Sequence, residues 1–210
     1  MYKTIKRILD FAAAIILIVI LSPVYVFVSI LIFSENRGKI FYKQIRTGMN
    51  GNTFTIFKFR TMHENAEPDG PVWAGINDGR ITRTGKILRD LGIDEIPQLF
   101  NVIKNDMSLI GPRPERPHFT DKFAKLIHGY SVRHCVKPGI TGLSQIYYGS
   151  DQSIEDVKRK LRMDLLYIRK KSFKLDNYIL FLTIKHVSAK IISHVISPKK
   201  INSYYEGEIE

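Results

Sequence analysis

FAAAIILIVILSPVYVFVSILIF, residues 11–33, is an unbroken run without a charged side chain. A helix of this length can cross a bilayer's hydrocarbon core, which is about 30 Å thick. Ser22-Pro23 lies at the middle of the run, and a proline inside a helix removes a backbone donor and bends the helix. The run therefore predicts a membrane element that is broken at its centre. A cleaved signal peptide fits poorly, because the run is too long and no small-residue cleavage site follows it.

Both flanks of this run are basic, so the positive-inside rule assigns both to the cytoplasm. A helix that enters the bilayer, bends at Ser22-Pro23 and returns to the same side satisfies both flanks, whereas a straight span satisfies only one. The residues alone leave the re-entrant hairpin and the single span equally open. The basic residues are Lys3, Lys6 and Arg7 before the run, and Arg37, Lys39, Lys43 and Arg46 after it.

Composition sets the remaining limits. A chain of 210 residues forms one domain, or one domain with a membrane element. Its 32 Lys and Arg against 20 Asp and Glu give a net charge of +12. This charge favours an anionic partner: nucleic acid, an anionic leaflet or a phosphate-bearing substrate. The single cysteine, Cys135, excludes an internal disulfide framework and a cysteine-based zinc site.

Downstream of the apolar run, the pattern predicts a β-hairpin followed by a helix. Residues 40–45 and 54–59 read as strands joined by a turn rich in Gly and Asn. Residues 81–91 read as a helix that ends at Gly92. Residues 107–118 should be extended, because their prolines exclude a helix.

The C-terminal half reads as mostly helical. Residues 136–147 should form a loop and a short strand. A charged helix is expected at 154–170, and its inward positions are Val157, Leu161, Leu165 and Ile168. The segment 175–196 is apolar but carries lysines and histidines, which favours an amphipathic helix at a membrane interface. The last residues, 197–210, should form a solvated tail.

The segment 89–117, RDLGIDEIPQLFNVIKNDMSLIGPRPERP, carries the candidate chemistry. Asp94 is expected to be the N-cap of a second helix, with Glu95 beside it. Such an acidic pair is usually a cap with a solvated neighbour. At a helix N-terminus, however, free N–H groups favour anions, an aspartate can attack phosphorus and a glutamate can hold a divalent cation. The buried stripe of this helix should be Leu99, Phe100, Val102 and Ile103.

Basic residues surround this pair. Pro112 and Pro114 fix the backbone on both sides of Arg113, which lowers the entropy lost when the guanidinium binds a phosphate. An ordinary proline-rich turn is the alternative. Lys58 and Arg60 flank a strand end and project to one face, or else form a solvated basic edge.

Asp164 lies on the inward half of its predicted helix. It is either the partner of a buried arginine, which we favour, or a charge on the helix surface.

Taken together, these segments resemble the bacterial sugar transferases, the small monotopic phosphoglycosyl transferases. The similarity runs from about Lys6 to about Val187. It is carried by the apolar run with Ser22-Pro23, FKFRTM (57–62), NDGRITRTGKILRDLGIDEIPQLFNVIKNDMSLIGPRPERP (77–117), VKPGITGLSQI (136–146) and DLLYIRKKSFKLD (164–176). The order and spacing of these pieces make the resemblance specific.

The resemblance implies a reaction. A UDP-sugar gives its sugar-1-phosphate to undecaprenyl or another polyprenyl phosphate and releases UMP, as the first membrane step of exopolysaccharide, capsule, O-antigen or glycan synthesis. Asp94 is the implied nucleophile, which forms a covalent aspartyl-phosphosugar. Glu95 would assist through Mg²⁺ or by proton transfer. The implied substrate-binding residues are Lys58, Arg60, Arg89, Pro112, Arg113, Pro114 and Asp164.

The resemblance also implies an architecture. The fold class is α+β, with a re-entrant membrane helix-hairpin (1–36) broken at Ser22-Pro23. A small β-hairpin and a compact helical catalytic domain with amphipathic interfacial helices follow (37–196). The catalytic domain would lie on the cytoplasmic face of the inner membrane, against the lipid bilayer. Nucleic acid is not an implied partner, and a homo-oligomer is possible.

Two other functions remain open. A polyprenyl-phosphate glycosyltransferase would move the sugar alone and release UDP. That class normally uses a nucleotide-binding α/β sheet, and the chain has no such βαβ pattern. A non-enzymatic basic membrane adaptor would need neither the acidic pair nor the proline-flanked arginine.

Overall fold

A bend at Leu21 divides the N-terminal apolar run into two helices, α1 (Tyr2–Ile20) and α2 (Ser22–Glu35), which meet at 60°. Pro23 lacks the N–H that would bond to the Val19 carbonyl. The Ser22 hydroxyl donates a hydrogen bond to that carbonyl instead, at 2.8 Å. The predicted break is therefore confirmed. Within the described residues, no helix alone is long and apolar enough to cross a bilayer, whereas α1 and α2 together reach that length and composition.

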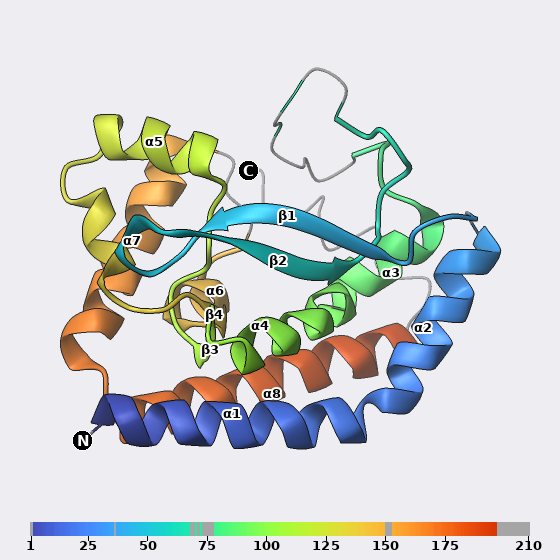
Figure 1. Ribbon diagram of the computed structural model, residues 1–210, viewed down its shortest axis with the longest axis horizontal. Helices are drawn as coiled ribbons and strands as arrows, with labels where there is room; N and C mark the ends of the chain where they lie inside the picture. Colours follow the sequence, from blue (N-terminus) through green and yellow to red (C-terminus); the bar gives the residue numbers. More distant parts are fainter. Residues whose placement is uncertain are drawn as a thin grey trace.

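The computed structural model describes residues 2–35, 37–67, 70, 72, 78–149 and 153–196 (Figure 1). The predicted tail, 197–210, lies outside this part. The fold mixes α and β as predicted, with these further elements: β1 (Phe41–Thr47), η1 (Met49–Gly51), β2 (Thr53–Phe59), α3 (Arg83–Leu91), η2 (Ile93–Gln98), α4 (Leu99–Ile103), β3 (Ser108–Ile110), α5 (Pro117–Leu126), η3 (Tyr130–Cys135), β4 (Gly139–Thr141), α6 (Leu143–Tyr147), α7 (Ile154–Lys170) and α8 (Phe173–Ile196).

The predicted hairpin is confirmed as the antiparallel pair β1–β2, in which Phe41 faces Phe59 and Thr47 faces Thr53. Ile56 of β2 packs against α1 and α4, and Phe59 packs against α2 and α3. Both side chains are almost fully buried. The hairpin therefore packs on α1, α2 and the α3–α4 region, and Figure 1 shows it lying along α3 and α4.

Arg7 joins α1 to α4. Its guanidinium donates to the carbonyls of Val102 and Ile103, at 2.5 and 3.0 Å. These groups lie at the C-terminal end of α4, where carbonyls lack partners within the helix. A basic side chain there also suits the negative end of the helix dipole.

Two short strands, β3 and β4, pair in parallel, and the backbones of Gly111 and Gly139 come close together beside this pair. Ser108 faces Gly139 and Ile110 faces Thr141. A Cβ on Gly139 would clash with the Gly111 nitrogen, so this close approach of the two backbones tolerates no side chain there. The loop and short strand expected within 136–147 are confirmed at 136–138 and at β4, but the last five residues form the short helix α6. The prediction missed α6 because its pattern is too short to show a period.

On the far side of the hairpin, α5, η3 and α7 enclose a separate cluster of apolar side chains. The predicted bounds of α7 are confirmed. The prediction of an extended chain to residue 118 was wrong, because α5 begins at Pro117. A proline in the first turn of a helix gives up no hydrogen bond, so it starts this helix instead of excluding it.

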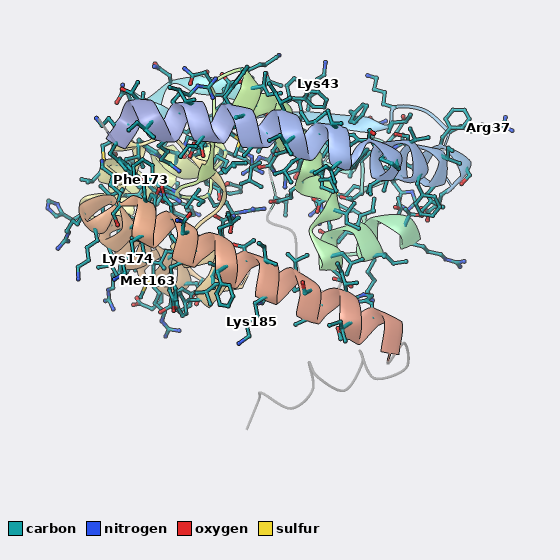
Figure 2. All side chains as sticks on the ribbon, turned by 90° about the horizontal axis from the view of Figure 1, so that it is seen from below. Arg37, Lys43, Met163, Phe173, Lys174 and Lys185 are labelled. Atoms are coloured by element: carbon teal, nitrogen blue, oxygen red, sulfur yellow. The ribbon has the colours of Figure 1, made fainter. Side chains whose placement is uncertain are left out.

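Helix α8 begins two residues before the predicted start and runs along the same side of the molecule as α1 (Figure 2). The two helices meet at their N-terminal ends, where Tyr2 contacts Phe173 and donates a 2.7 Å hydrogen bond to Asp176. Lys6 lies 3.1 Å from the same carboxylate. The exposed apolar side chains of the three helices include Ile8, Val19, Ile20, Val26, Phe27, Ile30, Phe33, Phe181, Ile184 and Ile192.

We predict that Gly139→Ala destabilises the fold, because the new methyl group would meet the backbone of Gly111. Overpacking of this kind costs roughly 1–3 kcal/mol. Thermal unfolding of the purified protein measures the loss. Gly79→Ala is the matched control, since a Cβ there has no atom within 4 Å. Equal stability of the two variants would contradict this close contact between the Gly139 and Gly111 backbones.

Candidate active site

The acidic pair lies in a 3₁₀ turn between α3 and α4. Gly92 ends α3 in the left-handed conformation, with φ of 71°, and is also the N-cap of η2. Asp94 and Glu95 occupy the first turn of η2. The prediction that Asp94 is an N-cap was therefore wrong. The chain turns directly from Gly92 into η2, so the Asp94 side chain makes no capping bond and is left for other contacts.

Asn101 aligns α4 with β2 and was missed by the sequence analysis. Its Oδ1 accepts from the Phe57 N–H at 3.0 Å, and its Nδ2 donates to the Thr55 carbonyl at 2.7 Å. Asn101 is fully buried, whereas Phe100, predicted to be buried, is 40% exposed. The one signal was an asparagine within an apolar stripe. Its bonds hold the strand that carries Lys58 beside η2.

Glu95 is the centre of the site. Lys58 Nζ lies 2.6 Å from Glu95 Oε1. The Arg113 guanidinium binds the same carboxylate with both nitrogens, at 3.0 Å to Oε2 and 2.5 Å to Oε1. Lys58 also lies 3.7 Å from Asp94 Oδ2. One carboxylate thus joins β2, η2 and the proline-flanked arginine, while Asp94 has only the more distant contact.

The two carboxyl groups have opposite pKa shifts. Burial opposes ionisation of Glu95, but the charges of Arg113 and Lys58 outweigh it and hold the pKa of Glu95 well below its usual range. Burial raises the pKa of Asp94, because Lys58 compensates only part of the desolvation and the Glu95 charge adds to it. Glu95 is therefore held as a carboxylate, and Asp94 is the more basic group.

The other predicted basic residues lie around the pair. Arg89 donates from Nε to the Thr61 hydroxyl at 2.8 Å, and its charge favours ionisation of Asp94. Arg60 is 8% exposed, and its guanidinium lies 3.1 Å from Glu64. Lys58 thus contacts the acidic pair directly, and Arg89 acts on Asp94 through its charge. The guanidinium of Arg60 forms its ion pair with Glu64.

The backbone of the arginine clamp, residues 112–114, is held through its carbonyls. Proline has no N–H, so carbonyl oxygens are the groups left to anchor Pro112 and Pro114. Each of the three carbonyls accepts a hydrogen bond. The donors are Gly139 N–H to Pro112 (2.9 Å), Arg133 Nη2 to Arg113 (2.8 Å) and Arg46 Nη1 to Pro114 (3.3 Å).

Asp164 lies in α7 and is 2% exposed. Its Oδ2 lies 2.7 Å from Arg133 Nη2, and the Ser144 hydroxyl donates to its Oδ1 at 2.7 Å. The expected pairing with a buried arginine is therefore confirmed. Direct substrate contact by Asp164 stays a prediction.

Asp94 and Glu95 would be the residues of this turn that hold a divalent cation. Within the described residues, no group of three or more His, Cys, Asp or Glu side chains could hold a metal ion. Asp94 and Glu95 offer two carboxylates. Mg²⁺ is typically bound through one or two carboxylates together with substrate phosphates. The pair therefore fits Mg²⁺ that arrives with a diphosphate, and such an ion would neutralise phosphate charge.

Comparison with known proteins assigns the family. The family model for bacterial sugar transferases matches residues 1–190. The chain belongs to the bacterial sugar transferase family. This agrees with the resemblance carried by the segments around Ser22-Pro23, the acidic pair and the clamp.

Individual relatives have specific names. The chain is 44% identical over 186 residues to the UDP-N-acetylgalactosamine-undecaprenyl-phosphate N-acetylgalactosaminephosphotransferase of Aeromonas hydrophila, covering 89% of this chain and 44% of that protein. It is 38% identical to the UDP-glucose:undecaprenyl-phosphate glucose-1-phosphate transferase of Klebsiella pneumoniae, over 85% of this chain and 39% of the relative. The chain thus spans less than half of these two proteins. It spans 87% of the uncharacterized sugar transferase EpsL of Bacillus subtilis, at 38% identity.

We predict that the two acidic residues affect stability in opposite directions at pH 7. Glu95→Gln leaves Lys58 and Arg113 without their counter-charge and should destabilise by roughly 1–3 kcal/mol. Asp94→Asn removes a carboxylate whose ionisation burial opposes, so it should raise the melting temperature. Melting temperatures of both variants and the wild type, measured from pH 7 to pH 3, check this.

The pH dependence has a defined sign. Because the pKa of Glu95 is lowered in the folded state, its stabilisation is present above its unfolded value near 4.5 and is lost as pH falls. The deficit of Glu95→Gln should therefore shrink below about pH 4.5. The gain of Asp94→Asn should also shrink on acidification, since Asp94 then becomes protonated. Destabilisation by both variants would contradict the assignment.

Proposed function

We propose that this chain transfers a sugar-1-phosphate from a UDP-sugar to polyprenyl phosphate and releases UMP. The observation that carries the proposal is Asp94, the less neutralised carboxylate of a pair whose neighbours are Lys58 and Arg113. Relatives named for UDP-sugar and undecaprenyl phosphate support the substrate classes. The pathway would be the first membrane step in synthesis of a polysaccharide or glycan.

Asp94 is the proposed nucleophile. One of its carboxylate oxygens attacks the β-phosphorus of the donor, and the bond from that phosphorus to the oxygen bridging the two phosphates breaks. UMP leaves with the bridging oxygen, and the sugar phosphate stays on Asp94. A phosphate oxygen of the polyprenyl phosphate then attacks the same phosphorus. The lipid-linked diphosphosugar forms, and Asp94 is regenerated as a carboxylate.

The cations around Glu95 are the proposed phosphate ligands. A diphosphate offers Arg113 and Lys58 the same kind of charge-assisted contact that Glu95 now provides. Donor binding would therefore draw these two cations partly away from Glu95. A freed Glu95 could share Mg²⁺ with the donor or move a proton. Arg89 adds positive charge on the Asp94 side.

A two-step route suits the substrates. The donor is soluble in water and the acceptor lies in lipid, so a covalent intermediate lets one site receive them in turn. Helix α2 is joined to the acidic turn, since Tyr25 Oη donates to the Ile96 carbonyl at 2.9 Å. If α1 and α2 form a re-entrant hairpin in the inner membrane, this bond holds the acidic pair close to the lipid surface, on the cytoplasmic side.

Asp94→Asn should abolish transfer and also UMP release from donor alone, because the amide cannot form the phosphosugar intermediate. We expect a loss of at least about a thousand-fold. The assay uses the purified chain in lipid nanodiscs with Mg²⁺, undecaprenyl phosphate and a panel of UDP-sugars, and it quantifies UMP and UDP. Asp121→Asn, an exposed aspartate of α5, is the control and should keep full activity.

Three outcomes would oppose the proposal. Full activity of Asp94→Asn would exclude Asp94 as the nucleophile. Release of UDP in place of UMP would indicate transfer of the sugar alone. Failure of the wild-type chain to turn over any UDP-sugar would favour a non-enzymatic membrane protein.

The proposed re-entrant hairpin predicts that both ends of the α1–α2 pair face the cytoplasm. In a Cys135→Ser background, Thr4→Cys and Lys39→Cys should react with a membrane-impermeant maleimide only in inverted membrane vesicles. Both positions are exposed in the structure. Wild-type Cys135, also exposed, is the control for the catalytic side. Labelling of Thr4→Cys and Lys39→Cys from opposite sides would indicate a single span instead.

A further inference from the structure

We propose that Arg133 is a positioning residue for the transfer site: it fixes the peptide of Arg113, and Asp164 and Tyr130 fix Arg133 in turn. The inference rests on the proposed function, because it assigns a purpose to the orientation of a phosphate-binding arginine. Within the part of the chain that the structure describes, Arg133, Asp164 and Tyr130 make no direct contact with Asp94 or Glu95.

Arg133 makes three polar contacts from one guanidinium. Nη2 donates to the Arg113 carbonyl at 2.8 Å and lies 2.7 Å from Asp164 Oδ2. Nη1 donates to the Tyr130 hydroxyl at 2.7 Å. The guanidinium carbon lies 5.2 Å from the centre of the Tyr130 ring. The Arg133 side chain is only 11% exposed, so these contacts are largely shielded from water.

The contact with Arg113 is the one that reaches the site. The peptide between Arg113 and Pro114 has no N–H, so its carbonyl is the only polar group through which that peptide can be held. Arg133 supplies the hydrogen bond to this carbonyl. The Arg113 side chain starts from the same residue and ends on Glu95. Turning this peptide would therefore displace the guanidinium, and a misplacement of about 1 Å can cost about a hundred-fold in rate.

The geometry requires an arginine. A planar guanidinium can address a carbonyl, a carboxylate and a hydroxyl in different directions at once. A lysine at 133 could keep the charge pair with Asp164 but would be a single point donor. Asp164 itself is held by the Ser144 hydroxyl and is almost fully buried. Its contribution to this arrangement is to orient and neutralise Arg133.

A purely structural ion pair is the competing explanation, because Arg133 and Asp164 also join η3 to α7. The two explanations differ in how the effect of an Arg133 substitution depends on Arg113. A structural role would weaken ligand binding equally whether or not the Arg113 side chain is present. A positioning role requires that side chain, so the two substitutions would be coupled.

A double-mutant cycle tests this with UDP, whose diphosphate is common to all donors of the proposed class. All variants carry Asp94→Asn so that no turnover occurs, and the full chain is held in lipid nanodiscs. Dissociation constants for UDP are measured by calorimetry with and without Arg133→Lys, first with Arg113 intact and then with Arg113→Ala. Arg162→Lys, an exposed arginine of α7, is the matched control.

We expect Arg133→Lys to weaken UDP binding about ten-fold when Arg113 is present and less than about two-fold in Arg113→Ala. Arg162→Lys should change neither constant. If Arg133→Lys does not fold, Tyr130→Phe replaces it, because it removes only the hydroxyl that Arg133 contacts. Tyr130→Phe should show a smaller loss, of about three-fold, again only with Arg113 present.

The outcomes separate the two proposals. Equal losses with and without Arg113, or no loss from Arg133→Lys, would overturn the positioning role and leave the proposed transfer intact. Absence of UDP binding to the Asp94→Asn chain with Arg113 and Arg133 intact, together with no UMP release by wild type, would overturn both.

Discussion

The site depends on one carboxylate with two cationic partners. Glu95 binds Lys58 from the hairpin and Arg113 from the clamp, so three separate parts of the chain meet at two oxygen atoms. This arrangement also sets the chemistry of the next residue. Since Glu95 takes most of the positive charge, Asp94 is buried with partial compensation and keeps a raised pKa. Neighbouring acids with pKa values pushed apart are typical of sites where each has a different role.

Around that carboxylate, hydrogen bonds to backbone groups hold in place the strand and the clamp that carry the two cations. Asn101 fixes the strand that carries Lys58, and the close approach of the Gly111 and Gly139 backbones allows the Gly139 N–H to reach the Pro112 carbonyl. Arg46, which precedes the clamp in the sequence, and Arg133, which follows it, donate to the other two clamp carbonyls. Positions within a site are precise when their supports are themselves fixed by packing and hydrogen bonds. Here these supports come from α4, the hairpin, β4 and η3.

Features set by local sequence were predictable, and features set by distant partners were not. The break at Ser22-Pro23, the hairpin and α7 follow from proline chemistry, turn residues and apolar spacing. The buried amide of Asn101 and the role of Arg133 depend on groups more than 15 residues away. Asp94 shows the opposite error. Its residue type and its position suggested a helix N-cap, but the left-handed Gly92 is itself the N-cap of the turn η2 that follows. The acidic pair and clamp were found from sequence, and their connection through Glu95 was not.

The Ser22 hydroxyl has a consequence for how the protein is made. The carbonyl that Pro23 leaves open is satisfied within the same segment, at 2.8 Å. In lipid, an unpaired backbone group costs several kcal/mol, so a broken helix normally relies on neighbouring protein for its missing bond. The Val19 carbonyl does not need such help. Under the proposed membrane topology, this carbonyl would be satisfied before the later segments of the chain are made and dock onto α1 and α2 through Arg7 and Tyr25.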